Sequence, residues 1–151
     1  MERYIHILLA GSVIGSMALC MVEDIRKRQI HTAAIVGFIV LNGMMAWYEH
    51  QEWKQMAAGV VLGIAFLLIS ICTGEKIGKG DALLILGIGM HQGFWSALMI
   101  VFTAMLMVCV HGLLLLKKKK GWKYEIAFVP FLLVPYAAAI ILQVCSDYIS
   151  V

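Results

Sequence analysis

Five long apolar segments alternate with short polar stretches along the chain. They cover residues 4–22, 30–48, 56–73, 82–116 and 126–144. Four of them come close to the length of about 20 residues that an α-helix needs to cross a bilayer. Because a backbone inside lipid must satisfy its own hydrogen bonds, such segments form helices. The pattern predicts an all-α, polytopic membrane protein.

The segment at residues 82–116 is too long for one crossing. As a single helix it would extend about 50 Å at about 1.5 Å per residue, whereas the hydrocarbon core is about 30 Å thick. Its polar interruption is the stretch Met90-His91-Gln92-Gly93. We therefore expect a short fourth helix from about Asp81 to Met90 and a full-length fifth helix from Phe94 to Leu116. The total becomes about six membrane helices.

The basic residues support six crossings. With this number of crossings, ten of the 12 Lys and Arg residues fall on one side of the membrane. They are Arg26, Lys27, Arg28, Lys76, Lys79, Lys117, Lys118, Lys119, Lys120 and Lys123. Cytoplasmic loops carry the excess of basic residues, so this side is predicted to be the cytoplasm. We expect a multi-pass protein of the plasma or inner membrane with both termini outside.

The composition leaves no room for a separate soluble domain. Of 151 residues, 62% are hydrophobic and 14% are charged, with a mean hydropathy of +0.91. Soluble domains carry about 25% charged residues. We expect a single integral-membrane domain over residues 1–151 in contact with the lipid bilayer, and we exclude a secreted enzyme, a Rossmann-type domain and a disordered regulator. The net charge of +3 is assigned to topology, so no nucleic-acid partner is expected.

Cysteines and histidines show no metal-ligand spacing. The four cysteines lie far apart and form no CxxC pair, so they are interpreted as small hydrophobic residues facing lipid or core. They are Cys20, Cys72, Cys109 and Cys145. Three histidines, His6, His50 and His91, fall on or near the outer side without the spacing of a metal site. The sequence therefore predicts no metal and no cofactor.

Two acidic residues stand out among the nine. Asp24 closes the first predicted helix and Asp81 opens the fourth, so both are expected at the same depth on the cytoplasmic side. Two carboxyl groups held close cannot both ionise readily, so one serves as an acid while the other serves as a base. Such a pair activates water for attack on an amide.

Each aspartate also has a simpler interpretation. Asp24 can be a solvated acid screened by the basic stretch that follows it. Asp81 can be the N-cap of its helix, where a carboxylate accepts free backbone N–H groups. The glycines beside it, Gly78 and Gly80, permit a sharp turn and tight packing just before the aspartate.

Three motifs in order carry a resemblance to a known family. They are Asp24-Ile-Arg-Lys-Arg-Gln-Ile30, Gly78-Lys79-Gly80-Asp81 and Val129-Pro130-Phe131-Leu132. This pattern resembles the prepilin peptidases, the type IV leader peptidases among the GxGD membrane aspartyl proteases. The resemblance implies that Asp24 and Asp81 are the catalytic pair, with motif support from Gly78, Gly80 and a helix bearing Pro130. The chain is also similar to the short members of tight-adherence (Flp) pilus systems, which lack the methyltransferase insertion.

Two departures from the family pattern bear on specificity. His31-Thr32 stands where the family has Pro-Asn, and Leu83 stands where a lysine often follows GxGD. Neither removes a carboxylate, but both put substrate choice and activity in doubt. The sequence does not identify the substrate protein. The small-residue spacing at Gly11 and Gly15 indicates close helix packing within or between subunits, which leaves a homo-oligomer open.

The leading hypothesis is a membrane aspartyl endopeptidase that removes the basic leader of prepilin or pseudopilin substrates. The alternative is a non-enzymatic small transporter or assembly partner that uses the aspartates for proton or cation handling. A transporter needs a polar path across the membrane. The predicted fourth helix offers no polar side chain from Ala82 to Gly89, which favours the peptidase.

Overall fold

The structure is a computed structural model that describes residues 2–27, 30–74, 78–117 and 127–149. All regular secondary structure in these ranges is α-helical, which confirms the predicted fold class. The helices are α1 (Glu2–Lys27), α2 (Thr32–Tyr48), α3 (Trp53–Cys72), α4 (Lys79–Lys117) and α5 (Val129–Ile149). The helix α1 continues past the apolar segment at residues 4–22, so Asp24 lies inside its last turn instead of beyond its end.

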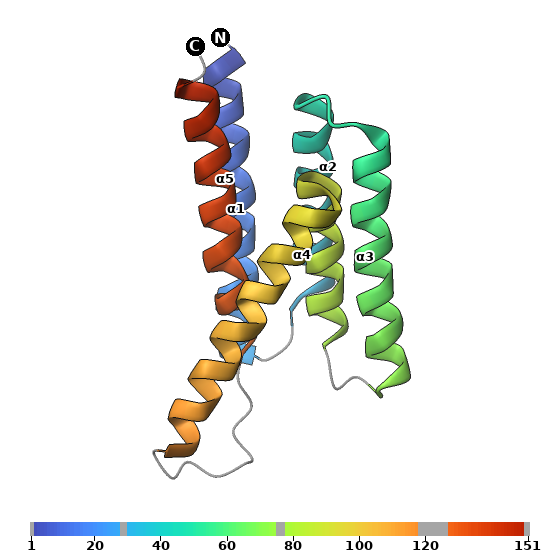
Figure 1. The fold of residues 1–151 in the computed structure, drawn as a ribbon, viewed down its shortest axis with the longest axis vertical. Coiled ribbons are helices and arrows are strands. Elements are labelled where there is room, and N and C mark those ends of the chain that lie inside the picture. The colour runs from blue at the N-terminus through green and yellow to red at the C-terminus, as the bar shows by residue number, and fades with distance from the viewer. Residues whose placement is uncertain (1, 28–29, 75–77, 118–126, 150–151) are drawn as a thin grey trace.

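The break predicted within the long apolar segment is present. Helix α4 is interrupted at Gly93, whose φ of 72° and ψ of 179° are not helical. This positive φ is accessible to glycine because glycine has no Cβ. The two halves of α4 run in opposite directions from this point (Figure 1). The described residues therefore form six helical segments, as the apolar pattern predicted.

The reversal at Gly93 gives the bundle two distinct ends (Figure 1). One end of the bundle, which we call the aspartate end, holds the end of α1 and the start of α5. Both the start and the end of α4 also lie there. The opposite end, which we call the terminal end, holds the start of α1, the end of α5 and the break in α4. Helices α1, α3, α4 and α5 contain segments long and apolar enough to cross a membrane, and α2 is a shorter apolar helix. The alternation of ends matches the predicted order of crossings.

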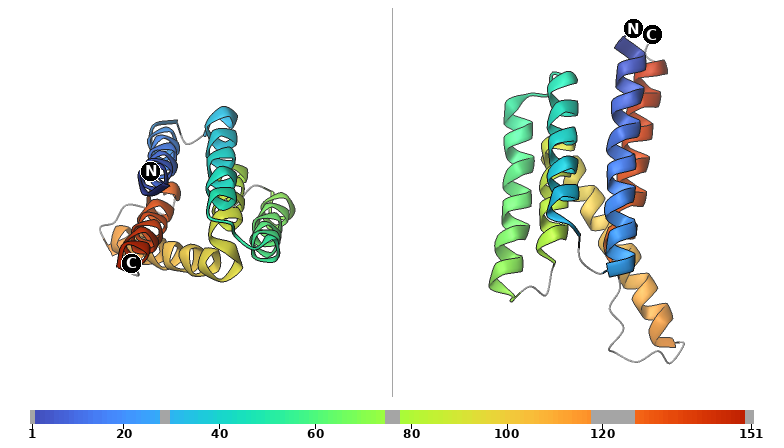
Figure 2. Two further views of the ribbon diagram at one scale, coloured as in Figure 1. Left: turned by 90° about the horizontal axis from the view of Figure 1, so that it is seen from above. Right: turned by 180° about the vertical axis from the view of Figure 1, so that it is seen from behind.

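The helices pack in two groups that the second half of α4 connects. Helices α1 and α5 lie side by side, while α2, α3 and the first half of α4 form the other group (Figure 2). Backbones approach most closely between α3 and α4, where a Cβ on Gly59 would overlap the carbonyl of Gly89 and a Cβ on Gly63 would overlap Leu86. Small residues allow this contact, as is common between membrane helices.

The core lies between the two groups of helices. Buried apolar side chains from α1, α2, α4 and α5 fill it, including Met17, Phe38, Ile88 and Tyr136. The outer surface carries many exposed aliphatic and aromatic side chains along the helices, which fits contact with lipid. Cysteines follow the same division, since Cys20 is buried and the other three are exposed.

The small-residue spacing in α1 plays no part in packing within the chain. A Cβ on Gly11 or on Gly15 would meet no atom within 4 Å. The neighbouring hydroxyls of Ser12 and Ser16 donate to backbone carbonyls of their own helix, those of Leu9 and Val13. The spacing therefore makes no close helix contact among the described residues, and its alternative role between subunits stays a prediction.

Candidate active site

Asp24 and Asp81 lie at the same end of the bundle although 57 positions separate them in the sequence. Asp24 is in the last turn of α1, and Asp81 is in the first turn of α4. Both side chains are half-buried, and the charge of Asp24 acts directly on the carboxyl group of Asp81. The fold thus brings together the two residues that the sequence singled out, while their catalytic role stays a prediction.

The first turn of α5 holds Asp24 in place. The backbone N–H of Val129 donates to Asp24 Oδ2 at 3.2 Å, and the backbone of Phe128 also interacts with this carboxyl group. The carbonyl of Phe128 accepts the first hydrogen bonds of α5, from Phe131 and Leu132. Asp24 therefore satisfies a backbone donor at the start of a helix, where the helix dipole favours negative charge. It is more than a solvated acid, so the simpler interpretation of Asp24 is wrong.

Pro130 lies in this same turn, directly after the residue that contacts Asp24. Proline has no backbone N–H, and its fixed φ suits the first turn of a helix. It therefore leaves fewer unsatisfied donors at the start of α5 and helps to fix the turn that contacts Asp24. The supporting role that the family resemblance implies for Pro130 stays a prediction.

Asp81 is not the N-cap of α4. The first backbone hydrogen bond of the helix runs from Ala82 N–H to the carbonyl of Gly78 at 3.2 Å, so Gly78 occupies the N-cap position. Asp81 is three residues further on and still within the first turn, where an acidic side chain complements the helix dipole. The N-cap interpretation is wrong by three residues because the helix begins earlier than the apolar segment does.

The two glycines of the motif make room for their neighbours. A Cβ on Gly78 would lie 3.0 Å from Asp81 Oδ2, and a Cβ on Gly80 would lie 3.3 Å from Ile30 Cδ1. Neither Gly78 nor Gly80 has a positive φ. Gly74, which follows the end of α3, does have a positive φ, of 66°. The tight packing predicted for Gly78 and Gly80 is present. The sharp turn predicted just before Asp81 involves the stretch from α3 to α4, whose residues 75–77 lie outside the described residues, so it stays a prediction.

The connection between α1 and α2 shows a local consequence of one departure from the family pattern. The backbone N–H of His31 donates to Glu23 Oε2 at 2.9 Å. A proline at this position could not make that bond because it has no N–H. The bond joins the residue before α2 to the end of α1 next to Asp24. The other departure, Leu83, is a half-buried residue one turn into α4.

Asp24 and Asp81 contribute two carboxyl groups to the aspartate end. Within the described residues, no group of three or more His, Cys, Asp or Glu side chains is arranged to hold a metal ion. His111 lies in the second half of α4 and is exposed. The centroid of its ring lies 5.3 Å from the centroid of the Phe131 ring. Two adjacent carboxyl groups near a membrane boundary can together hold and activate a water molecule.

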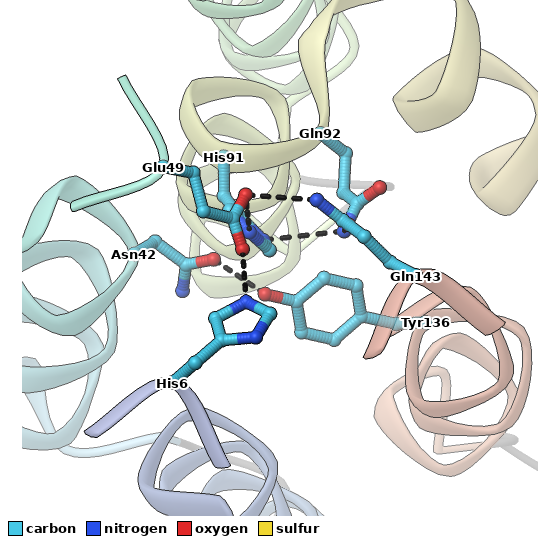
Figure 3. A network of polar contacts seen from close by, with 7 residues as sticks. All are labelled: His6, Asn42, Glu49, His91, Gln92, Tyr136 and Gln143. Atoms are coloured by element: carbon cyan, nitrogen blue, oxygen red, sulfur yellow. Dashed lines mark hydrogen bonds and ion pairs between the residues drawn. The ribbon is translucent and has the colours of Figure 1, made fainter. Parts of the chain in front are cut away.

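A second polar cluster, at the terminal end, was missed by the sequence analysis. His6, Glu49, His91, Gln92 and Gln143 form one hydrogen-bonded network there (Figure 3). The sequence analysis treated two of these histidines as isolated because their separation along the chain gave no ligand spacing. A signal was present, since polar residues at four helix ends share the same predicted depth.

Comparison with known proteins identifies a family. A sequence model of the type IV leader peptidase family matches residues 11–113. The matched region contains Asp24, Gly78, Gly80 and Asp81, whereas Pro130 lies outside it. No curated protein and no solved structure matches the chain. Since the family match covers more than half of the sequence, the chain belongs to the type IV leader peptidase family.

Proposed function

We propose that the chain is an aspartic endopeptidase that removes the basic leader of prepilin or pseudopilin proteins. The observation that carries this proposal is the meeting of Asp24 and Asp81 at one end of the bundle in a member of a leader peptidase family. The family implies a protease, and the two carboxyl groups supply the chemistry of an aspartic one. The short tight-adherence (Flp) type is the subgroup we expect, because the chain has no CxxC pairs of the kind that the methyltransferase insertion carries.

The proposed mechanism divides one proton between the two aspartates. Two carboxyl groups this close hold one proton and one negative charge between them. The ionised group takes a proton from water as the water oxygen attacks the scissile carbonyl carbon, and the protonated group donates to the carbonyl oxygen. When the tetrahedral intermediate collapses, the C–N bond breaks and a proton passes to the leaving amine. The bond from Val129 N–H orients Asp24 for this role.

The position of the pair suggests where a substrate is cut. We place the aspartate end at the cytoplasmic boundary because the described basic residues Arg26, Lys79 and Lys117 lie at this end. A scissile bond reaches the pair if it joins a polar leader to a membrane helix. The cut is therefore expected just before the apolar segment of the substrate. The family resemblance adds a glycine before the cut, where a small residue lets the chain extend.

A role in proton or cation transport is less well supported. Such a role needs polar groups that continue from the aspartates to the other end. Between the two ends, the buried polar side chains among the described residues include Ser70 on α3 and the pair Asn42 and Tyr136. The hydroxyl of Tyr136 donates to Asn42 Oδ1 at 2.5 Å. The amide of Asn42 in turn donates to the carbonyl of Phe38. Asn42 and Tyr136 satisfy one another within an apolar core and form no continuous path.

Co-expression with candidate prepilins tests the proposed function. We expect a shorter product on a gel and, by mass spectrometry, a new N-terminus directly before the apolar segment of the prepilin. A metal chelator should leave cleavage unchanged because the pair needs no metal. Absence of any leader removal from a panel of prepilins, or a cut inside the apolar segment, would overturn the proposal.

A further inference from the structure

Glu49 joins three helices at the terminal end of the bundle (Figure 3). It is the C-cap residue of α2, and its two carboxylate oxygens contact three side chains. Oε1 lies 2.8 Å from His6 Nε2 on α1, and Oε2 lies 3.1 Å from His91 Nε2 on α4. Gln143 on α5 donates to Oε2 through Nε2 at 2.8 Å. One carboxylate therefore connects α2 with each of these helices.

Further hydrogen bonds support this arrangement. The Nε2 group of Gln92 donates to Gln143 Oε1 at 3.2 Å and lies 3.2 Å from His91 Nδ1. The ring of His6 stacks on the ring of Tyr48, with 6.1 Å between the two ring centroids. His91 is almost fully buried, and the side chains of Glu49 and His6 are mostly buried. The protein therefore covers most of the surface of these three side chains. Such satisfied polar networks specify one arrangement of helices.

The helices that Glu49 joins are those that form the aspartate site. His6 and Asp24 lie near opposite ends of α1, and His91 and Asp81 lie near opposite ends of the first half of α4. Likewise, α5 contacts Asp24 through Val129 at its start and carries Gln143 near its end. A tilt of any of these helices at the terminal end moves its other end. The two ends of the bundle are therefore mechanically connected.

The charge of Glu49 is held in place by its partners. Burial alone would raise the pKa of Glu49, but hydrogen bonds from His91 and His6 outweigh it and lower this pKa from its ordinary value of 4.5. The other ionisable groups facing Glu49 are Tyr136 on α5, which its charge influences, and Tyr48 and Glu52, which line the same hollow of about 630 Å³. The network is thus intact at neutral pH.

We propose that Glu49 is a positioning residue for the aspartate pair, because its bonds to α1, α4 and α5 at the terminal end set how Asp24 approaches Asp81 at the other. This inference rests on the proposed peptidase function for its effect on catalysis. Glu49 does not touch the substrate or the reacting atoms. The bundle thereby couples a cluster on one side of the membrane to chemistry on the other.

The variant Glu49→Gln tests this coupling. A glutamine keeps the size of the side chain but replaces one acceptor oxygen with a donor, which cannot accept the bonds that Glu49 now accepts. We expect kcat for prepilin cleavage to fall at least about tenfold with little change in KM, since small misplacements of catalytic groups are costly. Glu52→Gln is the matched control, because it removes the same charge from the same hollow, and it should leave kcat unchanged.

A distance measurement separates positioning from local damage. Spin labels at Ile25 and Lys79, after replacement of the native cysteines, report the separation of α1 and α4 beside the aspartates. We expect a longer or broader distance distribution in Glu49→Gln and an unchanged one in Glu52→Gln. If Glu49→Gln does not fold, His6→Ala provides the same test, since it removes the bond to α1 alone.

The outcomes are distinct. A lower kcat together with an altered distance supports the inference, whereas an unchanged kcat, or a lower kcat with an unchanged distance, overturns it. If the wild-type chain cleaves no prepilin, the proposed function fails, and the spin-label distance alone then decides whether Glu49 positions the aspartates.

Discussion

The carboxyl groups at the two ends of the bundle have different surroundings. At the terminal end, Glu49 is surrounded by three side-chain partners that stabilise its charge. At the aspartate end, Asp24 accepts from the backbone at the start of α5, and Asp81 is half-buried beside the charge of Asp24. A fully bonded carboxylate holds helices together, whereas the nearby charge of Asp24 acts on the half-buried carboxyl group of Asp81. The proposed peptidase chemistry rests on this second arrangement.

The difference has a local origin in the chain. Glu49 follows the end of α2, beside the break at Gly93, so side chains from several helix ends reach it. Asp81 sits in a first turn where Gly78 leaves space for its carboxyl group instead of supplying a side-chain partner. The glycines at the aspartate end thus leave space for the side chains of Asp81 and Ile30, which a Cβ would crowd.

The largest expected contrast is in the accessibility of the two ends. Glu52 and Thr73 are exposed residues at opposite ends of α3, so single cysteines there should label from opposite sides of the membrane. In a background without native cysteines, an impermeant thiol reagent applied to intact cells should modify Glu52→Cys and spare Thr73→Cys. The reverse pattern would place the aspartate end outside and remove the basis for cytoplasmic cleavage.

Filling the space beside Asp81 should reduce cleavage strongly. The Cβ of Gly78→Ala would crowd Asp81 Oδ2 at 3.0 Å, so the carboxyl group must move. We expect a loss of about 10- to 100-fold in kcat/KM, measured with a purified prepilin. The control is Gly43→Ala, whose Cβ would make an ordinary contact of 3.5 Å with Met90 Cε. Equal activity of both variants would show that Gly78 does not shape the site.

Protonation of Glu49 in acid should lower the stability of the folded protein, because it weakens the network at the terminal end. Since the pKa of Glu49 is lower in the folded protein than its ordinary value of 4.5, its contribution to stability is present above about pH 4.5 and is lost as pH falls through the lower, folded value. The folded protein should therefore be less stable in acid than at neutral pH. Thermal unfolding in detergent at pH 7 and below pH 4 measures this difference. Glu49→Gln should lose less stability on acidification, and an equal loss in both proteins would contradict this assignment.

The fold was predictable from sequence because lipid imposes simple rules on it. Apolar length, the limit of about 30 Å and the distribution of basic residues together predicted six helical segments and the break that the structure has at Gly93. Exact helix ends were less predictable. Helix α1 continues through a charged stretch, and α4 begins two residues before Asp81, because backbone hydrogen bonding at a membrane boundary does not require apolar side chains.

The site was only partly predictable. A shared depth was enough to pair Asp24 with Asp81, since six crossings leave few positions at that level. The contact between Asp24 and Val129 was not predictable, because it depends on how α5 packs against α1. The network around Glu49 was missed for the same reason. The residues bonded to Glu49 lie 42 to 94 positions from it in the chain, and only packing makes them its neighbours.

The central claim is that Asp24 and Asp81 together perform the cleavage. The most direct test compares the cleavage rate of a purified prepilin by the wild-type chain with the rates of Asp24→Asn, Asp81→Asn and Glu23→Gln. Asparagine keeps the size of aspartate but can act as neither acid nor base, so each Asp variant should lose about 10²- to 10⁴-fold in rate while remaining folded. Glu23→Gln, the adjacent acid on α1, should cleave at the wild-type rate because glutamine still accepts the bond from His31. A rate within about tenfold of wild type in either folded Asp variant would contradict the account.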